Sequence, residues 1–240
     1  MVFRPEPVDA IILCGGRGSR LATVVSDVPK PFALVSGRPF LDHILDHLAA
    51  SGLVRRAVLA IGHMAERIVA HYAQCRPPLP VSFVHETEPL GTGGALINAL
   101  PATASDPVLG LNGDSLFRFD VRMLLRHHLD SGAEATLALV IVPDSGRYGS
   151  VELSGSRVAA LREKNAANRP GPINGGVMVL ARKLLERPVT ALSVERELLP
   201  AAISRGAVQG VVFETAFLDI GLPESFAGAP EFLRSFQDRQ

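Results

Sequence analysis

A cluster of glycines directly after a short apolar segment is the feature that most restricts how this chain can fold. Residues 8–14 are typical of a buried strand, and three glycines follow within residues 15–18. Open α/β sheets bind ligands beyond the carboxyl ends of their strands, where glycine lets backbone N–H groups approach a phosphate closely. Arg20 adds a planar fork and Lys30 a compact charge. The pattern predicts a loop that binds a nucleoside triphosphate.

Two common phosphate-binding signatures do not occur in the sequence. A Walker A loop requires G-x-x-x-x-G-K-[ST], and no such string is found. The dinucleotide fingerprint G-x-G-x-x-G fails because Leu21 stands where the third glycine is required. The remaining alternative is a tight strand-to-helix turn, which by itself would not require two spaced cations.

Four motifs carry a resemblance to a known family. They are G-G-R-G-S-R-L (15–21), V-V-S-D-V-P-K-P (24–31), E-P-L-G-T-G-G-A (88–95) and L-N-G-D-S (111–115). With them the chain resembles the sugar-1-phosphate nucleotidyltransferases, and within that family it is most similar to the D-glycero-D-manno-heptose 1-phosphate guanylyltransferases. Two departures are Cys14, where alanine is usual, and Phe32, where methionine is common. Neither departure removes a charged group.

The resemblance implies transfer of GMP from GTP to a heptose 1-phosphate, with release of pyrophosphate, in surface polysaccharide biosynthesis such as that of a capsule. Mannose 1-phosphate with GTP, or another hexose 1-phosphate, is the open alternative, because no residue decides between the sugars. A different class is a catalytically silent nucleotide-binding regulatory subunit, which would be free to lose the charged groups that this chain retains. A glycosyltransferase would usually carry a D-x-D motif, which the sequence lacks.

Composition indicates a globular protein with a small anionic substrate. The 24 basic and 24 acidic residues give a net charge of zero, so no overall field attracts nucleic acid or an anionic membrane. The two cysteines form no disulfide framework, and no signal peptide or apolar stretch of roughly 18 residues is present. We therefore expect a cytoplasmic protein without nucleic-acid or membrane partners. A homodimer is expected only because dimers are common.

Alternating strand and helix patterns predict the fold class. Residues 40–48 and 120–129 have helical spacing, and Asp120 is a candidate N-cap. We expect a doubly wound α/β fold with a mostly parallel, mixed sheet, and a small β-rich sugar-binding insertion after residue 143. Residues 1–240 would form one nucleotidyltransferase domain, with a nucleotide-binding half (about 1–143) and a sugar-phosphate-binding half (about 144–240). Strands are expected at 8–14, 56–61, 81–85, 107–111, 135–142, 150–153, 158–162, 173–180 and 208–213, and a final helix from Pro223.

Two aspartates are candidates for binding Mg²⁺. Asp114 follows an apolar run through Asn112 and Gly113, which puts a carboxylate at the tip of a predicted strand. A hard divalent cation needs only one or two protein carboxylates when phosphate oxygens complete its shell. The family resemblance assigns Asp114 and Asp219 to the metal. Spacing alone leaves a turn-forming role for Asp114 equally open.

The sugar phosphate requires a cation of its own. The resemblance gives Lys164 this role and gives Glu163 the sugar hydroxyls, although a solvated charge run at a strand end is the alternative. Asn174 and Gly149 lie in I-N-G-G and R-Y-G, where an amide and backbone groups can bind hydroxyls. Glu195 is a further candidate, and it equally suits the first turn of a helix.

Glu88 is the candidate for recognising the base. Guanine presents two N–H donors on one edge, and a carboxylate accepts two parallel hydrogen bonds from such a pair. Glu86 is as well explained as a surface carboxylate. Catalytic roles are expected for Arg20, Lys30, Asp114 and Lys164. The nucleotide-binding set is Leu13, Gly15, Gly16, Gly18, Ser19, Arg20, Lys30, Glu88, Gly91, Gly93 and Asn112.

Overall fold

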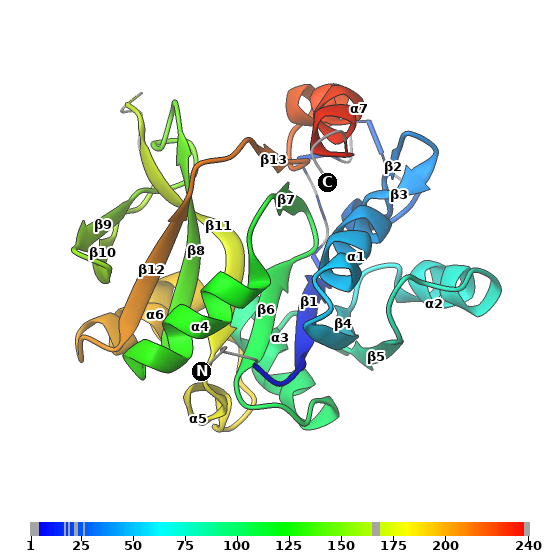
Figure 1. The fold of residues 1–240 in the computed structure, drawn as a ribbon. Helices are drawn as coiled ribbons and strands as arrows, with labels where there is room; N and C mark the ends of the chain where they lie inside the picture. Colours follow the sequence, from blue (N-terminus) through cyan, green and yellow to red (C-terminus); the bar gives the residue numbers. More distant parts are fainter. Residues whose placement is uncertain are drawn as a thin grey trace.

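A nine-stranded mixed sheet forms the centre of the molecule (Figure 1). The computed structural model describes residues 5–16, 18, 20–21, 24–25, 27–164 and 169–237. Within these residues the strand order is β5-β4-β1-β6-β11-β8-β12-β10-β9. The strands are β1 (Val8–Cys14), β4 (Val54–Ile61), β5 (Val81–His85), β6 (Val108–Asn112), β8 (Ala135–Val142), β9 (Val151–Ser154), β10 (Arg157–Leu161), β11 (Gly171–Leu180) and β12 (Val208–Phe213).

Most neighbouring strands of the first half are parallel. Strand β1 pairs in parallel with both β4 and β6, and β4 pairs in parallel with β5. Strand β11 runs antiparallel between β6 and β8, and β9 and β10 form an antiparallel hairpin beside β12. The expected doubly wound, mostly parallel sheet with a β-rich second half is confirmed.

Helices cover both faces of the sheet, as parallel strands require. Figure 1 shows α1 and α4 crossing in front of the sheet, with α3 and α6 behind it. Buried apolar side chains form one cluster on each face of the sheet. The cluster in front also includes residues of α2 and α7, and the cluster behind includes residues of α5. The helices are α1 (Phe40–Ala50), α2 (Ala65–Gln74), α3 (Gly91–Ala99), α4 (Val121–Ser131), α5 (Arg182–Leu185), α6 (Leu199–Ile203) and α7 (Pro223–Gln237), with 3-10 turns at Lys30–Phe32 and Leu100–Ala102 and a π-helical turn at Val194–Leu198.

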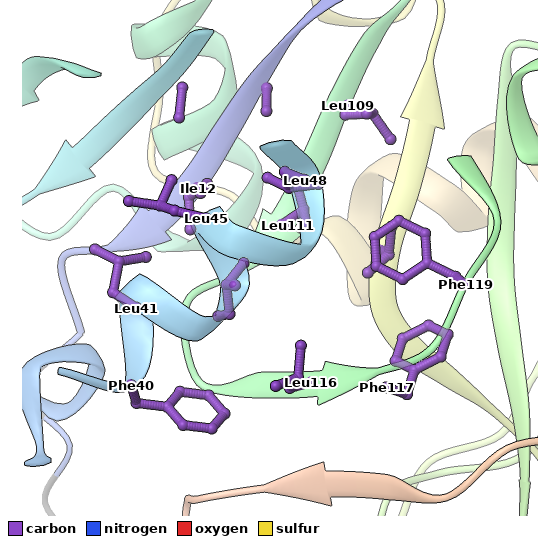
Figure 2. Packing of buried hydrophobic residues seen from close by; sticks show 14 of the residues in the cluster. Ile12, Phe40, Leu41, Leu45, Leu48, Leu109, Leu111, Leu116, Phe117 and Phe119 are labelled. Atoms are coloured by element: carbon purple, nitrogen blue, oxygen red, sulfur yellow. The ribbon is translucent and has the colours of Figure 1, made fainter. Parts of the chain in front are cut away.

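The apolar face of α1 packs on the centre of the sheet. Figure 2 shows Leu45 and Leu48 lying over Ile12 of β1 and Leu111 of β6. All four are almost fully buried, and each buried side chain of this size stabilises the fold by about 1.5–3 kcal/mol. The helical spacing predicted for residues 40–48 is therefore confirmed. Asp120 caps α4 as expected, because its side chain accepts a hydrogen bond from the Met123 backbone N–H at 3.0 Å.

Two short strand pairs were not predicted. Strand β2 (Leu34–Val35) pairs with β3 (Arg38–Pro39). Strand β13 (Phe217–Asp219) pairs antiparallel with β7 (Ser115–Phe117), which sets Asp219 opposite Ser115. The backbone N–H of Ile220 also donates to the Asp114 carbonyl at 3.0 Å. This small ladder joins residues about one hundred positions apart in the chain at one end of the main sheet.

A buried carboxylate fixes the opposite end of β1. Asp9 is fully buried and accepts hydrogen bonds from Arg55 at 2.7 Å and Arg56 at 3.1 Å, and from the backbone N–H groups of Ala104 and Ser105. Burial raises the pKa of Asp9, but the bonds from Arg55, Ala104 and Arg56 outweigh it and hold the pKa well below its usual range. Asp9 therefore joins β1, β4 and the loop before β6.

We predict that Asp9→Asn destabilises the protein by about 2 kcal/mol at neutral pH, because hydrogen bonds to a buried charge are lost while the two arginines stay partly exposed. The folded pKa lies below the unfolded value of about 3.9, so this stabilisation is present above that value and disappears as the pH falls through the folded pKa. Urea unfolding at pH 7 and at pH 3 measures it. The difference between variant and wild type should shrink at pH 3.

Asp46→Asn is the matched control, because Asp46 pairs with Arg38 at 2.9 Å where both side chains are exposed. Its effect should stay below about 0.5 kcal/mol. Equal losses in Asp9→Asn and Asp46→Asn would contradict the role given to Asp9.

Candidate functional site

Three adjoining cavities lie at the carboxyl ends of β1, β4, β5 and β6. Their volumes are about 500, 300 and 420 Å³, and we call them the first, second and third cavity. Thr92 lines all three. Arg20, Lys30, Asn112 and Asp114 line both the second and the third. The cavities therefore form one continuous cleft, in which Arg20, Lys30 and Asp114 lie where the second and third cavities meet.

The first cavity contains five of the eleven predicted nucleotide-binding residues. They are Leu13, Gly15, Gly16, Glu88 and Gly91. Glu88 is exposed on the loop after β5, within reach of a ligand in this cavity. The surroundings are otherwise mainly small or apolar, which suits the flat faces of an aromatic ring.

Glu86 lies deeper in the first cavity than Glu88. Its Oε2 accepts a hydrogen bond from the Leu90 backbone N–H at 3.3 Å, and burial raises the pKa of its carboxyl. A side chain at Gly15 would overlap the Glu86 carboxylate. The glycine at this position therefore allows the strand end and Glu86 to approach each other.

Lys30 brings two carboxylates together where the second and third cavities meet. Its Nζ donates to Asp114 Oδ2 at 2.6 Å and lies 3.5 Å from Asp219 Oδ1. The Gly221 backbone N–H donates to Asp219 Oδ1 at 2.6 Å, and Ser115 Oγ donates to Asp114 Oδ1 at 3.2 Å. Because an unpaired ammonium is costly to bury, the two aspartates are what allow Lys30 to sit only 13% exposed.

An aromatic cluster fixes the backbone that carries Lys30. The Phe32 ring packs edge-on against His71, with centroids 5.2 Å apart, and against Tyr72, with centroids 5.6 Å apart. Tyr72 in turn donates its hydroxyl to Asp42 Oδ1 at 2.7 Å. The departure from methionine at Phe32 thus lies in the packing beneath the cation and leaves the charges unchanged.

The third cavity gathers the predicted sugar-phosphate residues. Gly149, Glu163, Lys164, Asn174 and Glu195 all line it, together with Asp219. Gly149 has a φ of +90°, and a Cβ there would lie 2.6 Å from the Arg162 carbonyl oxygen. Glycine is therefore needed for the backbone of 149 to pass directly beside the strand end that leads to Lys164. Asn174 Oδ1 accepts from the Gly176 N–H at 3.1 Å, at the irregularity in β11.

Of the other six predicted nucleotide-binding residues, Arg20, Lys30 and Asn112 line the second cavity. Gly18 lines the second cavity beside Lys30. Gly93 is buried under Leu192 and is not among the residues that line the three cavities. Ser19 lies outside the described residues. The glycines of α3 thus meet a protein segment as well as the first cavity.

Residues outside the predicted set also reach the third cavity. Arg196 lines it and approaches Glu163, with its Nε 3.2 Å from Oε1. Tyr148 and Ser193 line it as well. The only indication of these residues in the sequence is that they lie within two positions of the predicted residues Gly149 and Glu195.

Cys14 lies behind the glycine loop, where it is almost fully buried. Burial, with the carboxylates of Asp114 and Glu86, raises the pKa of the Cys14 thiol well above its usual range. The thiol therefore stays protonated and packs as a small apolar group.

Asp114 and Asp219 supply oxygen ligands of the type that a hard divalent cation prefers. Among the described residues, no group of three or more His, Cys, Asp and Glu side chains is arranged to hold a metal ion. The pair can hold a cation only if ligand oxygens complete its shell, as phosphates would.

None of the described helices is long and apolar enough to cross a membrane.

Comparisons with known proteins identify the class. The chain matches the nucleotidyl transferase family over residues 9–235, and it belongs to that family. The resemblance derived from the motifs is thereby confirmed. A putative glucose-1-phosphate thymidylyltransferase from Bacillus anthracis shares the fold, with a TM-score of 0.80 at 19% identity over 94% of this chain and 95% of that one.

Three relatives are about one third identical to this chain. The chain is 34% identical to the D-glycero-alpha-D-manno-heptose 1-phosphate guanylyltransferase of Aneurinibacillus thermoaerophilus, over 95% of this chain and all of that one. It is also 34% identical to a mannose-1-phosphate guanylyltransferase of Mycobacterium tuberculosis, over 95% of this chain but 65% of that one. HddC from Yersinia pseudotuberculosis, solved with GMP-PN, superimposes with a TM-score of 0.84 at 33% identity, covering 94% of this chain and 99% of that one.

We predict that Gly221→Ala lowers the rate of nucleotidyl transfer about 10- to 100-fold, the usual range for disturbing groups that orient a charged site. A Cβ at Gly221 would lie 2.8 Å from Lys30 Nζ and 2.7 Å from Asp219 Oδ1, between the two charges. Pyrophosphate release measures the rate. Gly228→Ala on α7 is the control, because a Cβ there meets no atom within 4 Å. Equal rates in both variants would show that the spacing of Lys30 and Asp219 is unimportant.

Proposed function

We propose that this chain transfers GMP from GTP to D-glycero-D-manno-heptose 1-phosphate, giving GDP-heptose and pyrophosphate. The observation that carries the proposal is the cluster of Lys30, Asp114 and Asp219 at the junction between a cavity suited to a base and a cavity rich in polar groups. The similarity to heptose 1-phosphate guanylyltransferases supports the choice of substrates. The product would be an activated sugar for surface polysaccharide synthesis in the cytoplasm.

The reaction requires alignment more than proton transfer. An oxygen of the sugar phosphate attacks the α-phosphorus of GTP, a new P–O bond forms, and the bond to the β-phosphate oxygen breaks as pyrophosphate leaves. The nucleophile is already an anion, so no strong general base is needed. Arg20 would hold the departing pyrophosphate, and Lys30 lies in the same cavity to share its charge. Lys164 would bring the sugar phosphate toward the α-phosphate from the third cavity.

Asp114 and Asp219 are the residues that would hold Mg²⁺. Their carboxylates approach the same ammonium group, at 2.6 and 3.5 Å, so they lie close enough to share a cation with ligand phosphates. When bound, the metal would offset negative charge on the phosphates. Lys30, whose ammonium pairs with both carboxylates, would offset part of their negative charge and so reduce the repulsion between them.

Mannose 1-phosphate is the second candidate acceptor. The similarity to the mannose-1-phosphate guanylyltransferase of M. tuberculosis favours it, at the same identity as the heptose enzyme. The heptose assignment is preferred because two heptose 1-phosphate guanylyltransferases, from A. thermoaerophilus and from Campylobacter jejuni, match this chain over 100% and 97% of their own length. Both candidates use the same chemistry and differ only in contacts within the third cavity.

A substrate panel tests the proposal directly. The protein is incubated with Mg²⁺, each of the four common nucleoside triphosphates and a set of hexose and heptose 1-phosphates, and pyrophosphate release is measured. We expect release with GTP and a manno-heptose 1-phosphate. Release only with mannose 1-phosphate would transfer the assignment to the second candidate. No release with any pair would favour a silent nucleotide-binding subunit.

We further predict that Glu88→Gln lowers kcat/KM for GTP about tenfold or more, because an amide cannot accept both N–H groups of guanine. The preference for GTP over ATP should fall by a similar factor. Glu86→Gln is the companion variant, since Glu86 Oε2 is engaged by the Leu90 N–H within the same cavity. Loss of the base preference in Glu86→Gln and not in Glu88→Gln would assign the base contact to Glu86 instead.

A further inference from the structure

The loop before the π-helical turn is joined to the start of α3. The carbonyl oxygen of Leu192 accepts hydrogen bonds from the backbone N–H groups of Gly93 at 3.0 Å and Gly94 at 3.2 Å. The Leu192 N–H donates to the Leu90 carbonyl at 2.9 Å. These bonds use N–H groups of the first helical turn that have no partner within the helix. The contact is tight, because a Cβ at Gly91 would lie 2.6 Å from the Leu192 oxygen.

Thr92 lies where this loop meets α3, and its hydroxyl makes two hydrogen bonds. Its Oγ1 accepts a hydrogen bond from the Val194 backbone N–H at 2.8 Å and donates to Glu195 Oε2 at 3.2 Å. Ser193 Oγ lies 3.1 Å from the same carboxylate oxygen and donates to it. Both hydroxyls therefore engage Oε2. Within the part of the chain that the structure describes, no hydrogen bond occupies Oε1 of Glu195, which leaves this oxygen for a ligand.

The position of Thr92 gives this arrangement a consequence for the reaction. Thr92 lines all three cavities, whereas Ser193 and Glu195 line only the third. Glu195 is an exposed side chain, and such a carboxylate samples several rotamers unless other groups fix it. Two hydroxyl donors on one oxygen restrict that freedom and direct the second oxygen.

We propose that Thr92 is a positioning residue for the sugar phosphate, acting by holding Glu195 so that its Oε1 accepts a hydrogen bond from a sugar hydroxyl. This inference rests on the proposed function, because it requires that the sugar occupies the third cavity. Thr92 thereby connects the cavity assigned to the base with the residue assigned to the sugar. Its role is separate from any contact that the backbone of residues 91–94 makes with the nucleotide.

The test replaces only the hydroxyl. Thr92→Val keeps the shape of the side chain and removes both hydrogen bonds, so KM for the heptose 1-phosphate should rise about tenfold, as for a lost bond to a charged group. The KM for GTP and kcat at saturating sugar should change by less than about twofold. Thr92→Ser retains the hydroxyl and should restore the wild-type KM. Thr190→Val removes an exposed hydroxyl from the same loop and serves as the control.

A double variant tests whether Thr92 acts through Glu195. In a Glu195→Ala background, adding Thr92→Val should raise the sugar KM no further, because the group that Thr92 positions is already gone. Multiplied effects of the two substitutions would overturn the proposal. So would an equal rise in both KM values, or a Thr92→Ser variant as impaired as Thr92→Val.

Direct binding separates this inference from the proposed function. Titration calorimetry with D-glycero-α-D-manno-heptose 1-phosphate requires no turnover. About tenfold weaker binding to Thr92→Val than to wild type supports the positioning role, even if no pyrophosphate is released. Unchanged binding to Thr92→Val, or no binding to wild type, overturns it. Sugar binding without turnover in the wild type overturns the proposed function alone.

Discussion

The burial of the parallel strands on both faces is the constraint on which the rest of this molecule depends. Along β1 every residue except Leu13 is buried, because α1 covers one face and α3 the other. Polar and charged groups can therefore meet solvent only beyond the strand ends. Leu13, the partly exposed exception, lines two of the three cavities. The site lies where it does because the sheet leaves no other part of its central strands accessible.

Lys30 then decides how that end of the sheet is organised. Its ammonium meets carboxylates from two distant parts of the chain, Asp114 after β6 and Asp219 at the end of β13. The β7–β13 ladder brings the two backbones together, and the Phe32 contacts with α2 fix the backbone of the cation. Each of these supports is apolar packing or backbone pairing. The charges can therefore respond to a ligand while the scaffold that carries them stays in place.

Features that depend on local sequence periodicity could be predicted, whereas contacts between residues far apart in the chain could not. Buried strands such as 8–14 and the amphipathic face of α1 have strong local periodicity, and both were predicted with nearly correct bounds. The β7–β13 ladder could not be found in this way, because three-residue strands have too little periodicity and Asp219 finds its partner a hundred residues away. The motifs and the resemblance named Asp114 and Asp219. The ion pairs that Lys30 forms with both aspartates are tertiary contacts, which local sequence patterns do not reveal. Arg196 was missed because nothing in its own segment indicates the approach to Glu163.

The glycines at the start of α3 have a structural role that the motif alone does not reveal. The sequence predicts that Gly91 and Gly93 bind the nucleotide, yet Gly93 and Gly94 lie against Leu192 and Thr190 of another segment. Their small size permits a second stretch of chain to dock on the helix start and to carry Glu195 toward the third cavity. The polar lining of that cavity comes from loops, strand ends and the first turns of helices, which have too little periodicity of their own, so sugar choice is the property least accessible from sequence. The residue proposed to contact the base, Glu88, lies on the loop directly after β5, whose position follows from the sheet itself.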